Sequence, residues 1–352
     1  MAAYSSVGPR VAGIVTCVPK KKFNNIEDTT GFTQNEVKKV VAMAGVRERR
    51  VAGDSICSSD LCAAAAERLL DMLQWERDSV DCLIMVTQTP DYFLPSTACV
   101  LHQRLNLSDA CAAFDVGLGC SGYPYGLWLS AMMLAAKGFR RVLLLHGETP
   151  SRFSDKADRS VSLLFGDAGS ATALERNNEH QGEEWHFLLH TDGNGFKDMI
   201  IEGGGFRDRF CKDPGKHYVQ MNGAHVFNFT ISRVPVLIQA TLDLSGLSKE
   251  AVDYYIFHQS NKYIIQHITK KMGLIEKSVP MILKDYGNTG GVSVPLTITE
   301  GNLDRPGNKS LKLLLLGYGV GLSWSSALIA LGPEALLKNI ELDHLQKEND
   351  EQ

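Results

Sequence analysis

The amino-acid sequence predicts an α/β protein built from two similar halves. The first reason is that short aliphatic or β-branched runs, typical of buried strands, alternate with longer helix-like segments. The second reason is that the same order of runs occurs twice along the chain. At 352 residues, the chain is long enough for two packed halves of ordinary size with a large buried core.

Five consecutive segments of the first half show the alternation most clearly. We expect strands at 80–88 (VDCLIMVTQ), 110–117 (ACAAFDVG) and 140–148 (RRVLLLHGE). Between them, STACVLHQRLNL at 96–107 and CSGYPYGLWLSAMMLAAKGF at 120–139 predict helices. The second helix is apolar on nearly every side and ends before Gly138, which indicates a buried helix with a glycine at its C-terminal end.

The repeat is visible as pairs of similar segments. DSVDCLIMVTQ from Asp78 resembles EAVDYYIFHQS from Glu250, and VLHQRLNL resembles the later IIQHITKKMGL. After each pair comes an extended stretch that runs into a glycine cluster, FDVGLGCSG in the first half and LKDYGNTGG in the second. The spacing from the shared Val-Asp to the cluster is 39 residues in the first half and 35 in the second. An alternative is that any α/β chain yields vague strand and helix echoes.

From this repeat we predict an N-terminal half at 1–180, a C-terminal half at 181–335 and a charged tail at 336–352. We expect the two halves to be related by a pseudo-twofold axis, with their glycine clusters meeting near it. The tail sequence LKNIELDHLQKENDEQ is expected to form a terminal helix that frays.

The composition excludes several classes of protein. The formal net charge is −4, so the chain lacks the basic excess typical of nucleic-acid binding. No window of 18 uncharged apolar residues predicts a membrane span, and the N-terminal sequence has no signal-peptide pattern, which favours a cytoplasmic protein. The eight cysteines include no C-x-x-C pair, so we expect buried thiols and no metal site.

Cys120 is the exception among these thiols. It lies between glycines at the start of the apolar helix, where free N–H groups and the helix dipole favour a thiolate, so we expect a lowered thiol pKa. Gly119 and Gly122 leave room for a substrate carbonyl, and the N–H of Cys120 could contribute to an oxyanion hole. A buried and inert cysteine is the alternative.

The second half supplies candidate partners for this thiol. His258 follows the hydrophobic run YYIF, at the carboxyl end of a predicted strand, where α/β proteins gather polar chemistry. Asn288 lies in the glycine-rich turn YGNTGG. Each residue alone could be structural, as a packed histidine or a turn asparagine. The repeat places both opposite Cys120 and predicts one shared site.

Four motifs, in this order, resemble the ketoacyl-ACP synthase III branch of the thiolase superfamily. They are FDVGLGCSGYPYGL, HQSN, YGNTGGVSVP and GYGVGLSWSSALI, and the likeness extends over about residues 11–331. The resemblance implies a five-layer α-β-α-β-α sandwich and a homodimer. It places the nucleophile at Cys120, the other two catalytic residues at His258 and Asn288, and the oxyanion hole at the backbone N–H groups of Cys120 and Val320.

The reaction that this resemblance implies has two stages and needs no cofactor. Cys120 takes an acyl group from an acyl thioester of coenzyme A or acyl carrier protein (ACP). His258 and Asn288 then stabilise the enolate formed when malonyl-ACP loses carbon dioxide, and this carbanion attacks the acyl-cysteine to give a 3-oxoacyl thioester.

The resemblance also places seven residues at the substrate or at the carrier protein. They are Arg152, near the nucleotide phosphates; Gly223, Phe227 and Asn261, along the phosphopantetheine arm; Lys270 and Lys271, facing the acidic carrier; and Leu94, in the partner's acyl pocket. Without the resemblance, the two lysines would equally indicate a solvated helix face.

Several positions depart from the family pattern. Lys39 and Met43 stand where the family has an adenine-stacking tryptophan and arginine, Tyr263 replaces an expected basic residue, and Val320 replaces a common glycine. We therefore expect a specialised member of the family. The alternatives are an acyltransferase that moves the acyl group to a hydroxyl or amine, a non-catalytic partner subunit, and a cysteine hydrolase.

Overall fold

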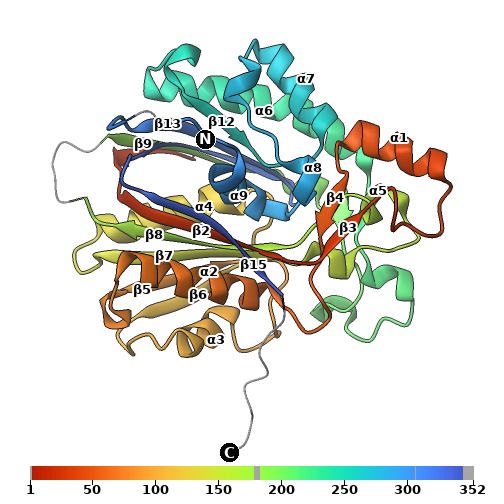
Figure 1. The fold of residues 1–352 in the computed structure, drawn as a ribbon, viewed down its shortest axis with the longest axis horizontal. Coiled ribbons are helices and arrows are strands. Elements are labelled where there is room, and N and C mark those ends of the chain that lie inside the picture. The colour runs from red at the N-terminus through yellow and green to blue at the C-terminus, as the bar shows by residue number, and fades with distance from the viewer. Residues whose placement is uncertain (1, 178–182, 306, 344–352) are drawn as a thin grey trace, which may run out of the picture.

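The computed structural model describes residues 2–177, 183–305 and 307–343. Two β-sheets lie face to face, with helices between them and on both outer faces (Figure 1). The helices α2 and α3 cover one sheet, α6 and α7 cover the other, and α4 and α9 contact both sheets. The bounds of these helices are α2 (Ser58–Leu73), α3 (Thr97–Arg104), α4 (Gly122–Ala135), α6 (Gly223–Ser245), α7 (Lys262–Met272) and α9 (Ser293–Glu300). The expected five-layer α-β-α-β-α sandwich is therefore confirmed.

Within the described residues, the first sheet has six strands in the order β15-β2-β8-β7-β5-β6. Their bounds are β2 (Arg10–Pro19), β5 (Cys82–Val86), β6 (Ala112–Val116), β7 (Arg141–Glu148), β8 (Ala168–Glu175) and β15 (Leu336–Leu342). The second sheet has five described strands in the order β1-β9-β14-β13-β12. Their bounds are β1 (Ala2–Val7), β9 (Glu184–Thr191), β12 (Tyr254–Phe257), β13 (Leu311–Gly319) and β14 (Ser323–Leu331).

The two sheets repeat one pattern of strand directions. In the first sheet, β5 and β7 are parallel, whereas β7 with β8 and β8 with β2 are antiparallel. In the second sheet, β12 and β13 are parallel, whereas β13 with β14 and β14 with β9 are antiparallel. The duplicated arrangement expected from the sequence is present in the strand pairing itself.

Both ends of the described chain cross from one half to the other. The strand β1 pairs with β9 in the second sheet, and β15 pairs in parallel with β2 in the first. The helix expected from residue 337 is therefore wrong for this segment, because its alternating apolar residues complete a sheet edge. The remaining tail, 344–352, and residues 178–182 near the predicted boundary lie outside the described residues.

The stretch before the second glycine cluster, expected to be extended, is helical in the structure. In the first half this stretch is the strand β6, but its counterpart is the short helix α8 (Leu283–Tyr286). Smaller elements lie on one side of the sandwich (Figure 1). They are β3 (Lys22–Asn24), α1 (Gln34–Ala44), β4 (Glu48–Arg50), α5 (Arg159–Ser162), β10 (Met199–Ile200) and β11 (Gln220–Met221).

The helix α4 is apolar all round because it lies between two sheets. Tyr123, Leu127 and Leu134 belong to a buried cluster that also contains residues of β5, β7 and β13. The helix runs so close to β7 that a Cβ on Gly126 would come within 2.6 Å of Leu144 Cδ1. This packing fixes the start of α4, and therefore the turn before it that carries Cys120.

Helices long and apolar enough to cross a membrane are absent from the described part of the chain. Nor do three His, Cys, Asp or Glu side chains among the described residues form a group that could hold a metal ion. All eight cysteines are free, and five of them are buried as expected. Cys99 is exposed, however, and Cys57 and Cys211 are partly exposed.

Replacement of Ile340 by Asp tests whether β15 is part of the folded core. Ile340 packs against the cluster between α2 and the first sheet, so a carboxylate there should cost about 2 kcal/mol of unfolding free energy. We expect a lower melting temperature by circular dichroism. The exposed Glu334, in the turn before β15, provides the control variant Glu334→Gln, which should have the melting temperature of the unchanged protein. Equal melting of the Ile340→Asp variant would contradict the assignment of β15.

Candidate active site

Cys120 lies in a tight turn between β6 and α4. The N–H of Gly122 donates to the carbonyl of Gly119 at 2.7 Å and closes this turn. The end of β13 passes directly behind it: a Cβ on Gly317 would lie 2.8 Å from the Cys120 carbonyl oxygen, and one on Gly319 would lie 2.9 Å from Cys120 Sγ. The glycines of the sequence GYG are therefore needed because the backbone of β13 touches the cysteine.

Burial dominates the electrostatics of this thiol. It raises the pKa of Cys120 to about 12, while the backbone N–H groups of Val320 and Cys120 lower it and the charge of Glu148 raises it. The expected lowering of the thiol pKa is therefore wrong. Removal from water destabilises the thiolate more than the nearby N–H groups stabilise it. In addition, α4 begins only at Gly122, two residues after Cys120. Cys120 rests as a neutral thiol.

His258 follows β12 and is buried beside Tyr318. Its Nδ1 lies 2.9 Å from Ser293 Oγ, and the hydroxyl of Tyr318 donates to the His258 carbonyl at 3.0 Å. Burial lowers the pKa of His258 to about 4, with a further lowering from His146, so the imidazole is neutral at pH 7.

Ser293 lies where its hydroxyl can select the tautomer of this imidazole. The backbone N–H of Gln259 donates to Ser293 Oγ at 2.9 Å, which leaves the serine O–H free to donate to Nδ1 of His258. The ring proton is then carried by Nε2. His258 can therefore donate a hydrogen bond while uncharged.

Asn288 lies in a rigid turn after α8. Its N–H donates to the Leu164 carbonyl at 2.9 Å, and its carbonyl accepts from Gly166 N–H at 3.0 Å. Its side-chain Oδ1 accepts from Gly290 N–H at 3.0 Å, which directs the amide nitrogen away from this turn. The turn needs a glycine before Asn288, since Gly287 has a φ of 73°.

Shared neighbours bring Cys120, His258 and Asn288 together. A Cβ on Gly291, in the turn of Asn288, would lie 2.4 Å from the carbonyl oxygen of Gly119, next to Cys120. The backbone of Gly290 interacts with His258, and the ring of Tyr318 lies 5.5 Å from that of His258. The neighbour of Tyr318, Gly319, contacts Cys120 as described above. The glycine clusters of both halves thus meet at one buried place.

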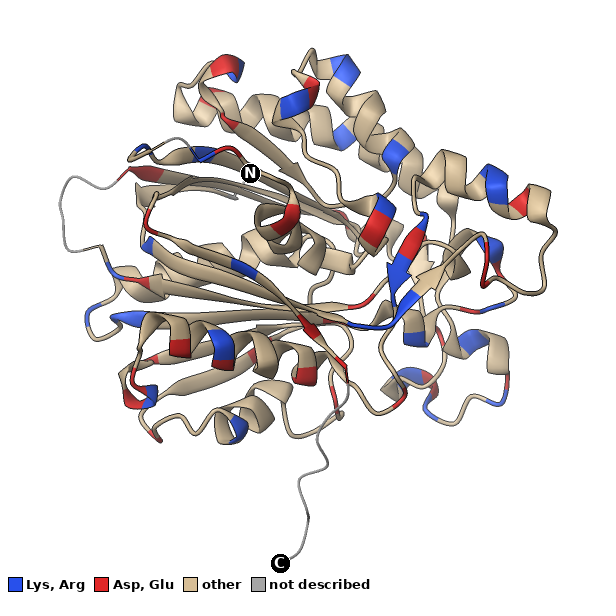
Figure 2. Ribbon diagram, in the orientation of Figure 1, with Lys and Arg blue, Asp and Glu red and all other residues tan. Residues whose placement is uncertain are grey.

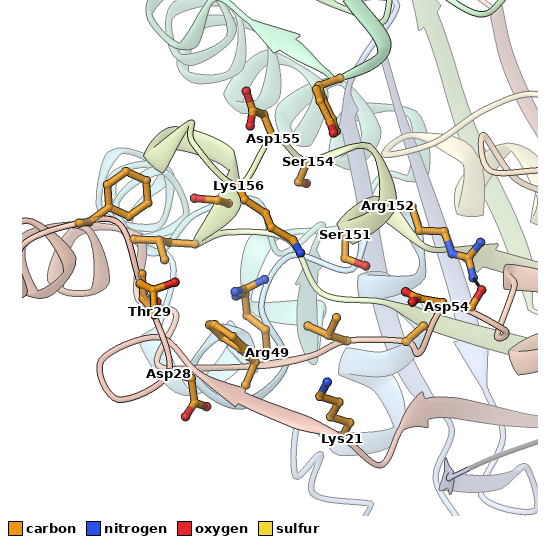
Figure 3. Close-up of a pocket in the computed structure, with 18 residues that line it drawn as sticks. Lys21, Asp28, Thr29, Arg49, Asp54, Ser151, Arg152, Ser154, Asp155 and Lys156 are labelled. Atoms are coloured by element: carbon orange, nitrogen blue, oxygen red, sulfur yellow. Dashed lines mark hydrogen bonds between the residues drawn. The ribbon is translucent and has the colours of Figure 1, made fainter. Parts of the chain in front are cut away.

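Arg152 lies farther out, beside a polar cavity of about 770 Å³ (Figure 3). Its guanidinium donates to the carbonyls of Asp54 and Ile56, both at 2.7 Å, so part of its donor capacity is used within the chain. Lys21 and Lys156 direct their charged ends toward the middle of the cavity (Figure 3). The guanidinium of Arg49, which also lines it, donates to Asn25 Oδ1 at 2.7 Å and to the Phe165 carbonyl at 3.0 Å. Of the other predicted substrate-binding residues, none lines this cavity.

Five of those residues lie on α6 and α7 or at their N-termini. Gly223 begins α6, and Asn261 caps α7 by accepting a hydrogen bond from Tyr263 N–H at 2.8 Å. The ring of Phe227 stacks on that of Tyr263, with the centroids 5.9 Å apart. Lys270, like its neighbour Lys271, is exposed at the end of α7, a helix on which basic residues are evident (Figure 2).

Leu94 does not reach the buried site of its own chain. It is 78% exposed in the loop between β5 and α3, next to Tyr92 and Phe93, which are also exposed. Lys39 and Met43, the two departures on α1, are also exposed.

Two positioning residues were missed in the sequence, Ser293 and Tyr318. Both belong to motifs used above, YGNTGGVSVP and GYGVG, but a serine or a tyrosine in such a motif gives no sign of its partner. Only the fold brings Ser293 to the ring of His258 and Tyr318 to its backbone.

Replacement of Ser293 by Ala tests whether Ser293 orients His258. A neutral hydrogen bond contributes about 0.5–1.5 kcal/mol, so we expect kcat for the reaction proposed below to fall about tenfold. The acylation of Cys120, measured separately by intact mass, should be unchanged. Ser130, equally buried but bonded only within α4 at 2.8 Å, provides the control variant Ser130→Ala. An equal loss in both variants would contradict the orienting role.

Comparison with known proteins agrees with this geometry. Residues 114–193 match the family model for 3-oxoacyl-[acyl-carrier-protein] synthase III, and residues 242–331 match the model for the C-terminal part of that family. The first matched segment contains Cys120, and the second contains His258 and Asn288.

Relatives cover nearly the whole chain. The putative 3-oxoacyl-[acyl-carrier-protein] synthase 3 of Campylobacter jejuni is 34% identical in an alignment of 336 residues that covers 91% of this chain and 93% of that protein. The crystal structure of a Burkholderia xenovorans 3-oxoacyl-(acyl-carrier protein) synthase is 42% identical, with a TM-score of 0.91 over 97% of this chain and 99% of that one. The priming β-ketosynthase of the R1128 polyketide pathway is 25% identical, with a TM-score of 0.81 over 92% and 96% of the two chains. This chain therefore belongs to the 3-oxoacyl-ACP synthase III family and has its thiolase-like fold.

Proposed function

We propose that this chain is a condensing enzyme that forms an acyl-Cys120 intermediate and joins it to malonyl-ACP. The observation that carries the proposal is the meeting of a thiol, a neutral imidazole and an amide at one buried place. Cys120, His258 and Asn288 come from two halves of the chain and share the glycine turns as neighbours. A scaffold subunit would have no use for this arrangement.

In the first stage, Cys120 Sγ attacks the carbonyl carbon of an acyl thioester. A new carbon–sulfur bond forms to Cys120, the bond to the donor sulfur breaks, and the thiol proton of Cys120 ends on the departing thiol. In this proposal, the backbone N–H groups of Val320 and Cys120, which lower the pKa of the thiol, also stabilise the oxyanion of the tetrahedral intermediate.

In the second stage, malonyl-ACP loses carbon dioxide and leaves an enolate. The Nε2–H of His258 and the amide N–H of Asn288 donate to its oxygen, and both groups are uncharged before they do so. The enolate carbon then attacks the acyl-cysteine, and the Cys120 sulfur departs. Neutral donors suit this step because a carboxylate in their place would repel the developing negative charge.

The donor thioester enters, in this proposal, from the side of α6 and α7. Arg152 would hold its phosphate groups, and Gly223, Phe227 and Asn261 the phosphopantetheine arm. The nearby cavity has a mixed charge, because the acidic Asp28, Asp54 and Asp155 line it together with the basic side chains (Figure 3). The exposed Lys270 and Lys271 would face the acidic carrier protein.

We further propose that this chain is a specialised member of the family and not the enzyme that starts fatty acid chains from acetyl-CoA. In this proposal it is cytoplasmic and forms a homodimer. Lys39 and Met43 leave no aromatic ring for adenine at their positions. The exposed Leu94, with Tyr92 and Phe93, is available to enter the acyl pocket of a second copy.

Incubation with a panel of acyl-CoA and acyl-ACP donors tests the first stage. We expect one acyl adduct by intact mass, absent from the Cys120→Ala variant. Subsequent addition of malonyl-ACP should release carbon dioxide and a 3-oxoacyl-ACP. An adduct that passes to a hydroxyl or amine without carbon dioxide release would instead indicate an acyltransferase, and no adduct with any donor would refute an enzyme of this type.

Replacement of His258 by Ala tests the division of roles between the stages. We expect the variant to form the acyl adduct at nearly the original rate, because His258 donates only to the enolate. Release of carbon dioxide should fall by about a hundredfold or more, as for the loss of an oxyanion donor. Blocked acylation with intact decarboxylation would reverse the roles assigned here.

A further inference from the structure

The side chain of Gln88 lies against the turn that carries Cys120, and the mechanism above does not use it. Gln88 follows the end of β5 by two residues. Its amide touches Gly119, the residue before Cys120, because a Cβ on Gly119 would overlap with Gln88 Oε1 and would lie 3.0 Å from its Cδ. Since the Cα atoms of neighbouring residues are only about 3.8 Å apart, the amide lies close to the start of any group that Cys120 carries.

Val320 connects this amide with the oxyanion hole of the proposed reaction. The backbone N–H of Val320 acts on the sulfur of Cys120, and Val320 Cγ1 lies 3.5 Å from the same Cβ position on Gly119. In the proposed function, this N–H stabilises the oxygen of the acyl carbonyl. The acyl chain therefore begins beside the side chain of Val320 and within reach of the Gln88 amide.

Gln88 belongs to a different part of the molecule from the residues proposed for the phosphopantetheine arm. Those residues lie on α6 or at the start of α7, which cover the second sheet. The strand β5 before Gln88 belongs to the first sheet, and the loop after it leads to α3. An arm that enters along α6 and α7 leaves the side of Gln88 to the acyl group.

The backbone of Gln88 is fixed, but its side-chain amide is free. The backbone N–H of Gln88 donates to Glu148 Oε1 at 3.0 Å, and that of Thr87 donates to the Val116 carbonyl at 3.1 Å. The side-chain amide makes no hydrogen bond to another described residue, and Gln88 is exposed. An amide has two N–H donors and an accepting oxygen, so Gln88 can bind a carbonyl or a hydroxyl group.

We propose that Gln88 is a specificity-determining residue, whose amide binds a hydroxyl or keto group at C3 of the acyl group on Cys120. The inference rests on the acyl-Cys120 intermediate proposed above. A plain hydrocarbon chain would displace water from the amide without replacing its hydrogen bonds, which disfavours that chain. An oxygen at C3 replaces those bonds, and it lies only three bonds from the thioester carbonyl carbon.

The test compares the acylation of Cys120 by two pantetheine thioesters, 3-hydroxybutyryl and 3-methylbutyryl, followed by intact mass. The two acyl groups have nearly the same shape, and free pantetheine carries neither a nucleotide nor a carrier protein. We expect the better enantiomer of the 3-hydroxybutyryl probe to react about tenfold faster than the 3-methylbutyryl probe. A tenfold ratio corresponds to about 1.4 kcal/mol, the size of one hydrogen bond.

Replacement of Gln88 by Leu removes the amide and should abolish this preference. The ratio of the two rates is compared within each protein, so a general change in thiol reactivity cancels. Gln103, which is exposed on α3, provides the control variant Gln103→Leu, and this variant should keep the ratio of the unchanged protein. Equal rates in the unchanged protein, or an unaltered ratio in Gln88→Leu, would overturn the proposal.

The affinity of the Cys120→Ala variant for the same probes separates this inference from the proposed reaction. We expect its dissociation constants, measured by NMR titration, to show the preference for the 3-hydroxybutyryl probe, and the added Gln88→Leu change to remove it. That preference without any adduct in the unchanged protein would uphold the polar subsite and refute the reaction. An adduct without the preference would uphold the reaction and overturn the subsite.

Discussion

The close approach of β13 to the turn before α4 is the constraint on which the rest of the site depends. Without side chains at Gly317 and Gly319, the backbone of the second half lies against Cys120. That contact brings the Val320 N–H to the sulfur and Tyr318 to the backbone of His258. A side chain at either glycine would separate the halves where the chemistry requires them to touch, because interiors are close-packed and leave no spare volume.

Burial has opposite consequences for the two titratable groups of the site, and both are uncharged as a result. It raises the pKa of the Cys120 thiol and lowers that of the His258 imidazole. The resting site therefore contains no thiolate and imidazolium pair. The site instead holds fixed hydrogen-bond donors, namely backbone N–H groups and an amide, which stabilise negative charge only when it develops during the reaction. This arrangement suits a reaction whose oxyanion and enolate are both transient.

Local pattern was sufficient for the strands and helices of the first half. The runs that predict β5, β6 and β7 are mostly apolar, and the segment before Gly138, apolar on nearly every side, indicates a helix buried between two layers. The local sequence pattern gave wrong predictions where contacts with distant parts of the chain determine whether a segment is a helix or a strand. The stretch LKDY turns into α8 because it leaves the sheet, and the charged tail begins as β15 because β2 offers an unpaired edge. The charged composition of the tail does not indicate that it pairs with the edge of β2.

The sequence by itself determined the duplicated α/β arrangement, since apolar periodicity and the repeated glycine clusters are local properties of the chain. It also singled out Cys120, His258 and Asn288, because each lies where a strand or turn ends. Only the tertiary structure decided their protonation, since burial comes from residues far away in the chain. For the same reason it alone disclosed Ser293 and Tyr318: their roles are contacts with His258, which lies 35 and 60 residues away from them in the chain, and no run of neighbouring residues encodes such contacts.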